Sequence, residues 1–193
     1  MKRFSILIVA MILAVTMLVP EGASAASKKQ IPTAGECMIK YAKKYIGSRY
    51  KVGGTYLKNL KKKGDKNRVD CTGFVKGILK RYAGINLKGS WNSTIRRNAY
   101  KLGGVKIGTG KKALKKAKPG DLLVYKPERG YPQHFGFYYG KVKGKHKQLD
   151  ASPGGRGVKV RRISRNRFVI IRLEKTIAKK SDMYEDTVED ILD

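Results

Sequence analysis

The spacing of hydrophobic and polar residues changes part-way along the chain. Before Ala117, apolar side chains recur every three or four residues, which predicts amphipathic helices at residues 36–46, 71–83 and 93–100. After Ala117 the pattern alternates, which predicts strands at residues 122–125, 133–140, 148–152, 157–160 and 168–173. Helices followed by an antiparallel meander indicate an α+β domain, which we place at residues 36–175.

The N-terminal segment has the pattern of a secretory signal peptide. Lys2 and Arg3 precede an apolar run over 4–19, and the small residues 23–25 offer a cleavage site after Ala25. The apolar run is shorter than the roughly 18 residues of a transmembrane helix. An uncleaved membrane anchor is the alternative. We expect a signal peptide at 1–25, a linker at 26–35 and a secreted, extracellular or cell-wall-associated protein without a transmembrane segment after cleavage.

Charge is distributed unevenly. The formal net charge is +30, yet six of the fourteen Asp and Glu lie in the last twelve residues, which contain no Lys or Arg. Between the signal peptide and those residues, 42 Lys and Arg face seven acids, a charge of about +35. Such a body attracts polyanions, and for an exported protein the candidates include teichoic acids, anionic lipids and peptidoglycan carboxylates. The acidic segment 176–193 is predicted to be a disordered tail.

The same charge raises the possibility of nucleic-acid binding, and extracellular DNA is one candidate polyanion. The export signal argues against this function, and no nucleic-acid-binding motif is recognised. The lysine runs at 58–63 and 111–116 also lack the interleaved aromatic residues on which bases stack. We therefore expect no nucleic-acid partner.

Cys71 is the first candidate for chemistry. It stands where a polar segment gives way to a helical pattern, so its thiol would face the positive end of the helix dipole, which favours the thiolate. The alternative is a small buried cysteine. The second cysteine, Cys37, falls within the apolar pattern of the first helix. We expect two free thiols, one buried and one reactive, although a secreted chain could also form a disulfide.

A base and an orienting group follow on the predicted strands. His134 begins a strand, a rigid place for a general base, although a purely structural histidine is equally compatible with this position. His146 lies in a lysine-rich hairpin tip, where we expect it to be solvated. Asp150 and Gln148 share one face of the next strand, and either could hold the imidazole; Asp150 is the stronger candidate because it stabilises the imidazolium.

Five segments in order resemble the NlpC family of bacterial cell-wall cysteine peptidases. They are Tyr50–Gly54, Val69–Phe74, Lys118–Leu122, His134–Gly140 and Asp150–Ser152, and the similarity extends over roughly residues 37–173. The resemblance implies a papain-like α+β fold in which the cysteine helix packs on the antiparallel sheet. It also implies hydrolysis of amide bonds in peptidoglycan stem peptides, often the bond from γ-D-glutamate to diaminopimelate or lysine.

The resemblance also implies residue roles. Cys71 matches the nucleophile, His134 the base and Tyr50 a tyrosine that helps to form the oxyanion site. Asp70 and Thr72 match positions that contact the stem peptide, including its amino end. Two positions depart from the family pattern. The third catalytic position in the family is usually His, Asn or Gln, whereas this chain has Asp150 there. If the lengthened hairpin shifts the register, Gln148 takes this position instead. At the position after the nucleophile, Thr72 replaces the Ser that is common in the family.

Together these features predict a secreted peptidoglycan endopeptidase with a Cys/His thioester mechanism. Two alternatives remain open: a non-catalytic binder of anionic wall polymers, and an amidase or acyltransferase on the same fold. No metal or cofactor is expected, because no cluster of cysteines and histidines has metal-ligand spacing. The basic body is expected to adhere to teichoic acid in place of a separate wall-binding module.

Overall fold

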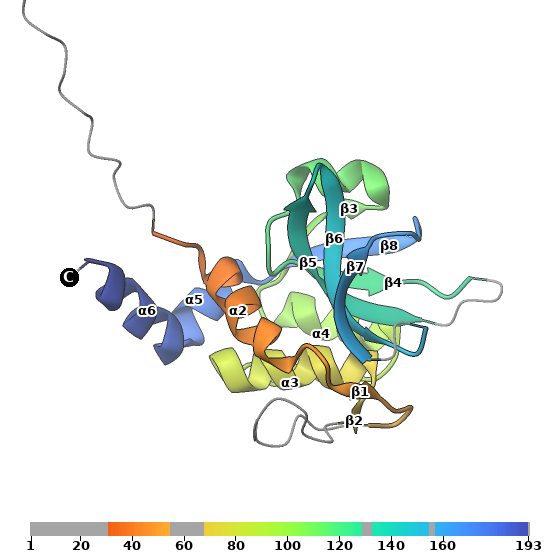
Figure 1. Cartoon of the computed structure of the whole chain (residues 1–193), viewed down its shortest axis with the longest axis horizontal. Coiled ribbons are helices and arrows are strands. Elements are labelled where there is room, and N and C mark those ends of the chain that lie inside the picture. The colour runs from red at the N-terminus through yellow and green to blue at the C-terminus, as the bar shows by residue number, and fades with distance from the viewer. Residues whose placement is uncertain (1–30, 55–67, 129–132, 155–156, 193) are drawn as a thin grey trace, which may run out of the picture. The chain divides into compact units, whose positions relative to one another are not determined.

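A computed structural model describes residues 31–54, 68–128, 133–154 and 157–192 (Figure 1). The expected signal peptide lies outside the described residues, as does most of the expected linker. Within the described ranges, no helix is long and apolar enough to cross a membrane.

The domain consists of helices and a six-stranded antiparallel sheet. The helices are α2 (Ala34–Ala42), α3 (Cys71–Ala83), α4 (Asn92–Lys101), α5 (Glu174–Lys180) and α6 (Asp182–Leu192), with 3-10 turns η1 (Lys43–Tyr45) and η2 (Lys111–Lys116). The sheet contains, in spatial order, β3 (Val105–Thr109), β8 (Phe168–Arg172), β4 (Leu122–Tyr125), β5 (His134–Val142), β6 (Lys145–Ser152) and β7 (Gly157–Arg162). A separate parallel pair joins β1 (Arg49–Tyr50) to β2 (Arg68–Val69).

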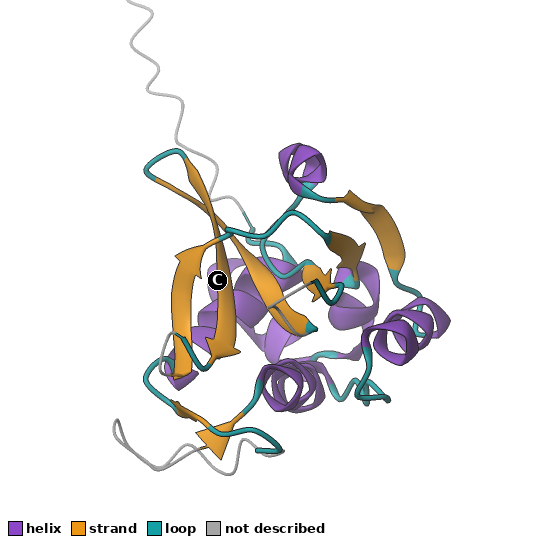
Figure 2. Ribbon diagram, turned by 90° about the vertical axis from the view of Figure 1, so that its right-hand side faces the viewer, coloured by secondary structure: helices purple, strands orange, loops and turns teal. Residues whose placement is uncertain are grey.

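The sheet has an apolar core on each face because its strands alternate. In β4, Leu122 and Val124 belong to the larger core, whereas Leu123 and Tyr125 belong to a smaller one. The larger core receives the apolar side of α3, where Phe74 meets Phe137 with ring centroids 6.1 Å apart. Figure 1 shows α2 and α3 on this side, with η2 toward the other side. The turned view in Figure 2 shows the twist of the strands.

The C-terminal segment corrects the expectation of a disordered tail over 176–193. It forms α5 and α6, which pack near α2 and α3. Ile177 is 1% exposed, and the buried Ser181 donates a hydrogen bond to the carbonyl of Tyr82 (2.8 Å) and accepts one from the Tyr184 N–H (3.2 Å). The acids of the first turn of α6 also suit the positive end of its dipole. The negative charge of this segment therefore led us to predict disorder and to overlook a short amphipathic helical pattern.

The start of the domain also lies slightly earlier than predicted. The helix expected from residue 36 begins at Ala34, and Thr33 caps it. Thr33 Oγ1 accepts from the Glu36 N–H (3.3 Å), and the Glu36 carboxylate accepts from the Thr33 N–H (2.8 Å), which is a capping box.

Candidate active site

Cys71 is the first residue of α3, at the end of the helix that faces β1 and β2. Asp70 caps the helix in an extended conformation, and its Oδ1 accepts a hydrogen bond from the Gly73 N–H at 2.6 Å. Cys71 is 8% exposed. Both cysteines are free thiols, as predicted. The local sequence thus fixes the thiol at a helix N-terminus.

The β1–β2 pair brings Tyr50 close to Cys71. Tyr50 lies opposite Val69, two residues before Cys71, and the Asp70 N–H donates to the carbonyl of Gly54 (3.0 Å). A Cβ on Gly54 would lie 2.5 Å from the Arg68 carbonyl oxygen, so this close approach requires glycine. Burial raises the pKa of Tyr50, and the nearby Cys71 and Asp70 raise it further, so the phenol keeps its proton at neutral pH.

His134 lies between Cys71 and Asp150. Its Nε2 is 2.6 Å from Asp150 Oδ2, and a hydrogen bond also links the imidazole to the Cys71 thiol. A Cβ on Gly136 would lie 2.9 Å from the Asp150 Cβ, so glycine in β5 permits the close approach of β6. The structure thus brings together the three side chains for which the sequence analysis predicted the roles of nucleophile, base and orienting group.

Asp150 is the residue that contacts His134, and Gln148 supports Asp150. Gln148 Nε2 donates to Asp150 Oδ2 at 2.6 Å, and the Tyr125 hydroxyl donates to Gln148 Oε1. The sequence left these two residues as alternatives, and the structure places both in one network. Asp150 is fully buried, so these side chains take the place of water around its carboxyl group.

Arg161 completes the network and was missed by the sequence analysis. Its Nε is 2.5 Å from Asp150 Oδ1, although the two atoms are not aligned as a hydrogen bond, so the contact is Coulombic. Arg161 Nη2 donates to the Gly157 carbonyl at 2.8 Å. Arg161 stands opposite Gln148 in the β6–β7 register and diagonal to Asp150. This register was the one signal that could have identified it.

The electrostatic environment keeps His134 protonated. Burial lowers its pKa, but the hydrogen bonds to Asp150 and Cys71 and the charges of both residues outweigh burial and raise the pKa to about 9. At neutral pH the imidazole is therefore an imidazolium between two groups that can be anionic.

His146 is not the solvated loop residue that we predicted. It lies in β6, with its Nδ1 2.7 Å from the Tyr138 hydroxyl. Burial and Lys141 lower its pKa. Its place beside Lys141 puts it at the far end of the β5–β6 hairpin from His134.

Comparison with known proteins gives the family. The sequence profile of the NlpC/P60 family matches residues 47–171. The chain belongs to this family. Its members are cell-wall hydrolases, and the papain-like α+β class predicted from the sequence is confirmed.

The chain is also similar to solved structures. The P60 domain of antigen MAP1204 from M. avium subspecies paratuberculosis is 25% identical, with a TM-score of 0.51 over 73% of this chain and 95% of that one. The NlpC/p60 domain of the peptidoglycan hydrolase SagA is 25% identical, with a TM-score of 0.49 over 70% of this chain and 97% of that one. No curated protein sequence matches the chain.

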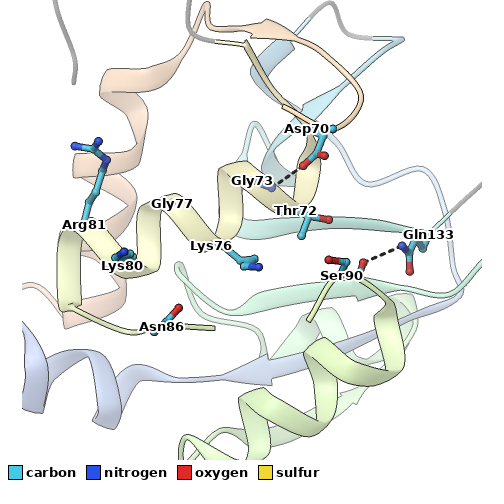
Figure 3. Close-up of a pocket in the computed structure, with 11 residues that line it drawn as sticks. Asp70, Thr72, Gly73, Lys76, Gly77, Lys80, Arg81, Asn86, Ser90 and Gln133 are labelled. Atoms are coloured by element: carbon cyan, nitrogen blue, oxygen red, sulfur yellow. Dashed lines mark hydrogen bonds between the residues drawn. The ribbon is translucent and has the colours of Figure 1, made fainter. Parts of the chain in front are cut away.

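In this NlpC/P60 domain a cleft of about 760 Å³ runs along α3 (Figure 3). Asp70 and Thr72, the predicted substrate residues on either side of Cys71, both line it. Ser90 and Gln133 form part of the opposite wall. Gln133 stabilises this wall through two hydrogen bonds. Its Oε1 accepts from the Asn92 N–H (2.8 Å), and its Nε2 donates to the Ser90 carbonyl (2.9 Å). A cleft of this size can hold several residues of a peptide.

The described residues contain no group of three or more His, Cys, Asp and Glu that could hold a metal ion. The side chains around Cys71 instead provide a thiol, an imidazolium and a phenol. This set can perform nucleophilic attack, proton transfer and oxyanion stabilisation.

Proposed function

We propose that this protein is a secreted peptidoglycan endopeptidase that cleaves amide bonds of cell-wall stem peptides through a thioester on Cys71. The observation that carries the proposal is the position of His134. Its ring contacts Cys71 on one side and Asp150 on the other, and these contacts raise its pKa to about 9. A cysteine beside an imidazolium is an activated nucleophile.

In the first step the Cys71 thiolate attacks the carbonyl carbon of the scissile amide. A C–S bond forms, and the carbonyl oxygen becomes an oxyanion. Two donors are available to it: the Cys71 backbone N–H, in the first turn of α3 where helical N–H groups lack helical acceptors, and the Tyr50 hydroxyl. A donor of this kind typically contributes about 3 kcal/mol to the stability of the transition state.

In the second step the C–N bond breaks. The His134 imidazolium gives its proton to the leaving amine and becomes neutral. It then removes a proton from water, which attacks the thioester and releases the carboxylic acid and the thiol. Asp150 holds the ring orientation throughout and stabilises each imidazolium form.

Purified peptidoglycan provides the test. We expect wild-type protein to release soluble fragments whose new amino and carboxyl ends lie within the stem peptide, as mass spectrometry would show. Cys71→Ala should slow release by a factor on the order of 1,000 or more because no other nucleophile remains. Cys37→Ala is the matched control, since Cys37 is a buried thiol of α2. Equal release by wild type and Cys71→Ala would refute the catalytic proposal.

The same fragments distinguish an endopeptidase from other enzymes of the fold. An amidase would release the stem peptide whole from the glycan, and an acyltransferase would join the acyl group to an added amine. Cleavage at an amide inside the stem is the result we expect.

We further propose that the basic surface adheres to anionic wall polymers such as teichoic acid. A depression of about 330 Å³ beside η2 supports this proposal, because four cations line it: Lys111, Lys112, Lys126 and Arg167. Binding of purified wall should weaken steeply with salt, and Lys111→Gln with Lys112→Gln should weaken it further. Binding that does not change with salt concentration would refute electrostatic adhesion to wall polymers.

Secretion is part of the proposal and rests on the N-terminal sequence. Protein recovered from the culture medium should begin at Ala26, which N-terminal sequencing would establish. Recovery of the protein in membranes with Met1 to Ala25 still attached would indicate an anchor instead.

A further inference from the structure

One side of α3 carries positive charge into the cleft. Thr72, Lys76 and Lys80 follow one another at four-residue intervals, so their side chains share one face of the helix, and all three line the cleft. Figure 3 shows the Lys76 side chain directed across the cleft toward Ser90. The opposite face of α3 is buried in the core, which leaves this face to the cleft.

Helix stability explains only one of the two lysines, because Lys80 lies in the last turn of α3, where a cation suits the negative end of the helix dipole, whereas Lys76 lies in the middle of the helix. Like charges at this spacing repel one another and destabilise a helix. Among the described residues that line the cleft, the one acid is Asp70, at the far end beside the nucleophile. Lys76 donates one hydrogen bond, to the Gly89 carbonyl at 3.3 Å, and an ammonium group has three donors. Lys80 is exposed.

The cleft therefore has opposite charges at its two ends. Asp70 uses Oδ1 to cap α3, and Oδ2 makes no hydrogen bond to another described residue. The polar side chains of Asn86 and Ser90 also line the cleft. A ligand that fits this arrangement carries an amino group near the nucleophile and a carboxylate farther along α3.

We propose that Lys76 and Lys80 form a subsite for a free carboxylate of the stem peptide. This inference rests on the proposed endopeptidase function and deepens it. Lys76 lies five residues after Cys71, about 7.5 Å along the helix axis. An extended peptide advances about 3.5 Å per residue. The same calculation gives about 13.5 Å for Lys80, nine residues after Cys71, so a carboxylate held between the two long side chains would lie about two to four residues from the scissile bond.

A set of synthetic stem peptides tests the subsite. Each peptide has the same sequence and a free amino end, and in each a different carboxylate is converted to a carboxamide. For one of these peptides, wild-type protein should lose kcat/KM on the order of tenfold, because a charge-assisted hydrogen bond is lost. The Lys76→Gln Lys80→Gln variant should cleave that peptide and its free-carboxylate parent at equal rates.

Two controls separate the subsite from general charge. Lys40→Gln Lys101→Gln removes two exposed lysines from α2 and α4 and should keep the preference of wild type. Lys76→Arg Lys80→Arg keeps both charges in the cleft and should also keep it. If the Lys40 and Lys101 control loses the preference equally, the effect is general and the subsite is wrong.

The remaining outcomes are also decisive. If wild type cleaves every peptide equally well, the subsite is wrong while the endopeptidase proposal stands. If wild type cleaves none of them, the endopeptidase proposal fails for these stem peptides and the subsite fails with it. If poly(glycerol phosphate) competes with peptide in wild type but not in Lys76→Gln Lys80→Gln, the lysines bind phosphate polymer, which overturns the carboxylate assignment.

Discussion

The sheet side and the helix side of this active site are built differently. On the sheet side, Asp150 is fully buried and contacts His134, Gln148 and Arg161. On the helix side, the cleft along α3 is open, and the Lys80 side chain on its wall is exposed. The proposed chemistry thus uses a rigid buried network, and the proposed recognition of substrate uses an open charged surface.

This difference has an energetic consequence. Charges buried in a network interact strongly, and removing one leaves the others unpaired. Charges along an open cleft are screened by water and salt. Substitutions on the sheet side should therefore change kcat and stability together, whereas substitutions in the cleft should change KM and its salt dependence.

The largest effect is expected for Asp150→Ala. It removes the anion that contacts both His134 and Arg161 and leaves two cations side by side. We expect kcat to fall by a factor on the order of 10,000, as for loss of the orienting residue in related triads, and the free energy of unfolding to fall by about 3–5 kcal/mol. Kinetics on a soluble stem peptide and urea unfolding measure the two effects. A loss of kcat below tenfold would show that Asp150 does not orient the base.

The pH dependence of activity tests the same network. Because the pKa of His134 is raised to about 9, its imidazolium persists through neutral pH, and kcat/KM should fall at alkaline pH with an apparent pKa of about 9. Asp150→Asn, which removes a charge and keeps the shape, should move this fall to lower pH. A fall near pH 6.5 in the wild type would contradict the arrangement.

Stability should follow the same titration. A histidine whose folded pKa is raised stabilises the fold fully below its unfolded pKa of about 6.5, and this contribution is lost as pH rises through about 9. The free energy of unfolding should thus decline between these values. In His134→Gln this part of the decline should disappear, which urea unfolding at several pH values would measure.

Arg161→Met should shift the alkaline fall in kcat/KM in the direction opposite to the shift expected for Asp150→Asn. Arg161 partly neutralises Asp150, so its removal lets the carboxylate act more strongly on His134 and raises the pKa of the imidazole. The alkaline fall in kcat/KM should therefore move to higher pH, with a loss of stability of about 1–3 kcal/mol. Arg162→Met, at the exposed next position of β7, is the control and should leave the profile unchanged. An unchanged profile in Arg161→Met would make Arg161 purely structural.

The same contrast between sheet and helix explains what the sequence could predict. The α3 pattern and the order of Cys71, His134 and Asp150 were readable because each lies within a short local motif. Asp150 and Gln148 could not be separated, because alternate residues of a strand share one face. The β5–β6 pairing also shifts register between Tyr138 and Gly140, a shift that local sequence does not specify.

Other features depended on contacts between distant segments. Arg161 reaches Asp150 only because β7 pairs with β6, and no motif surrounds it. The tail was misjudged because its acids suggested disorder, although Ile177 has a place in the core shared by α2 and α3. Candidate residues within short local motifs could therefore be predicted from the sequence. The residues that contact them from distant segments, such as Arg161, became visible only in the folded structure.

The smallest effect is expected in the cleft, at Thr72. Its side chain is half-buried on the cleft wall beside the nucleophile. Thr72→Val keeps the shape and removes the hydroxyl, so the loss of one hydrogen bond to substrate should raise KM by about two- to tenfold while kcat stays the same. Thr72→Ser keeps the hydroxyl and should match wild type. If Thr72→Val instead lowers kcat and leaves KM unchanged, the hydroxyl takes part in catalysis. The proposal that the sheet side serves catalysis and the cleft serves substrate binding would then be wrong.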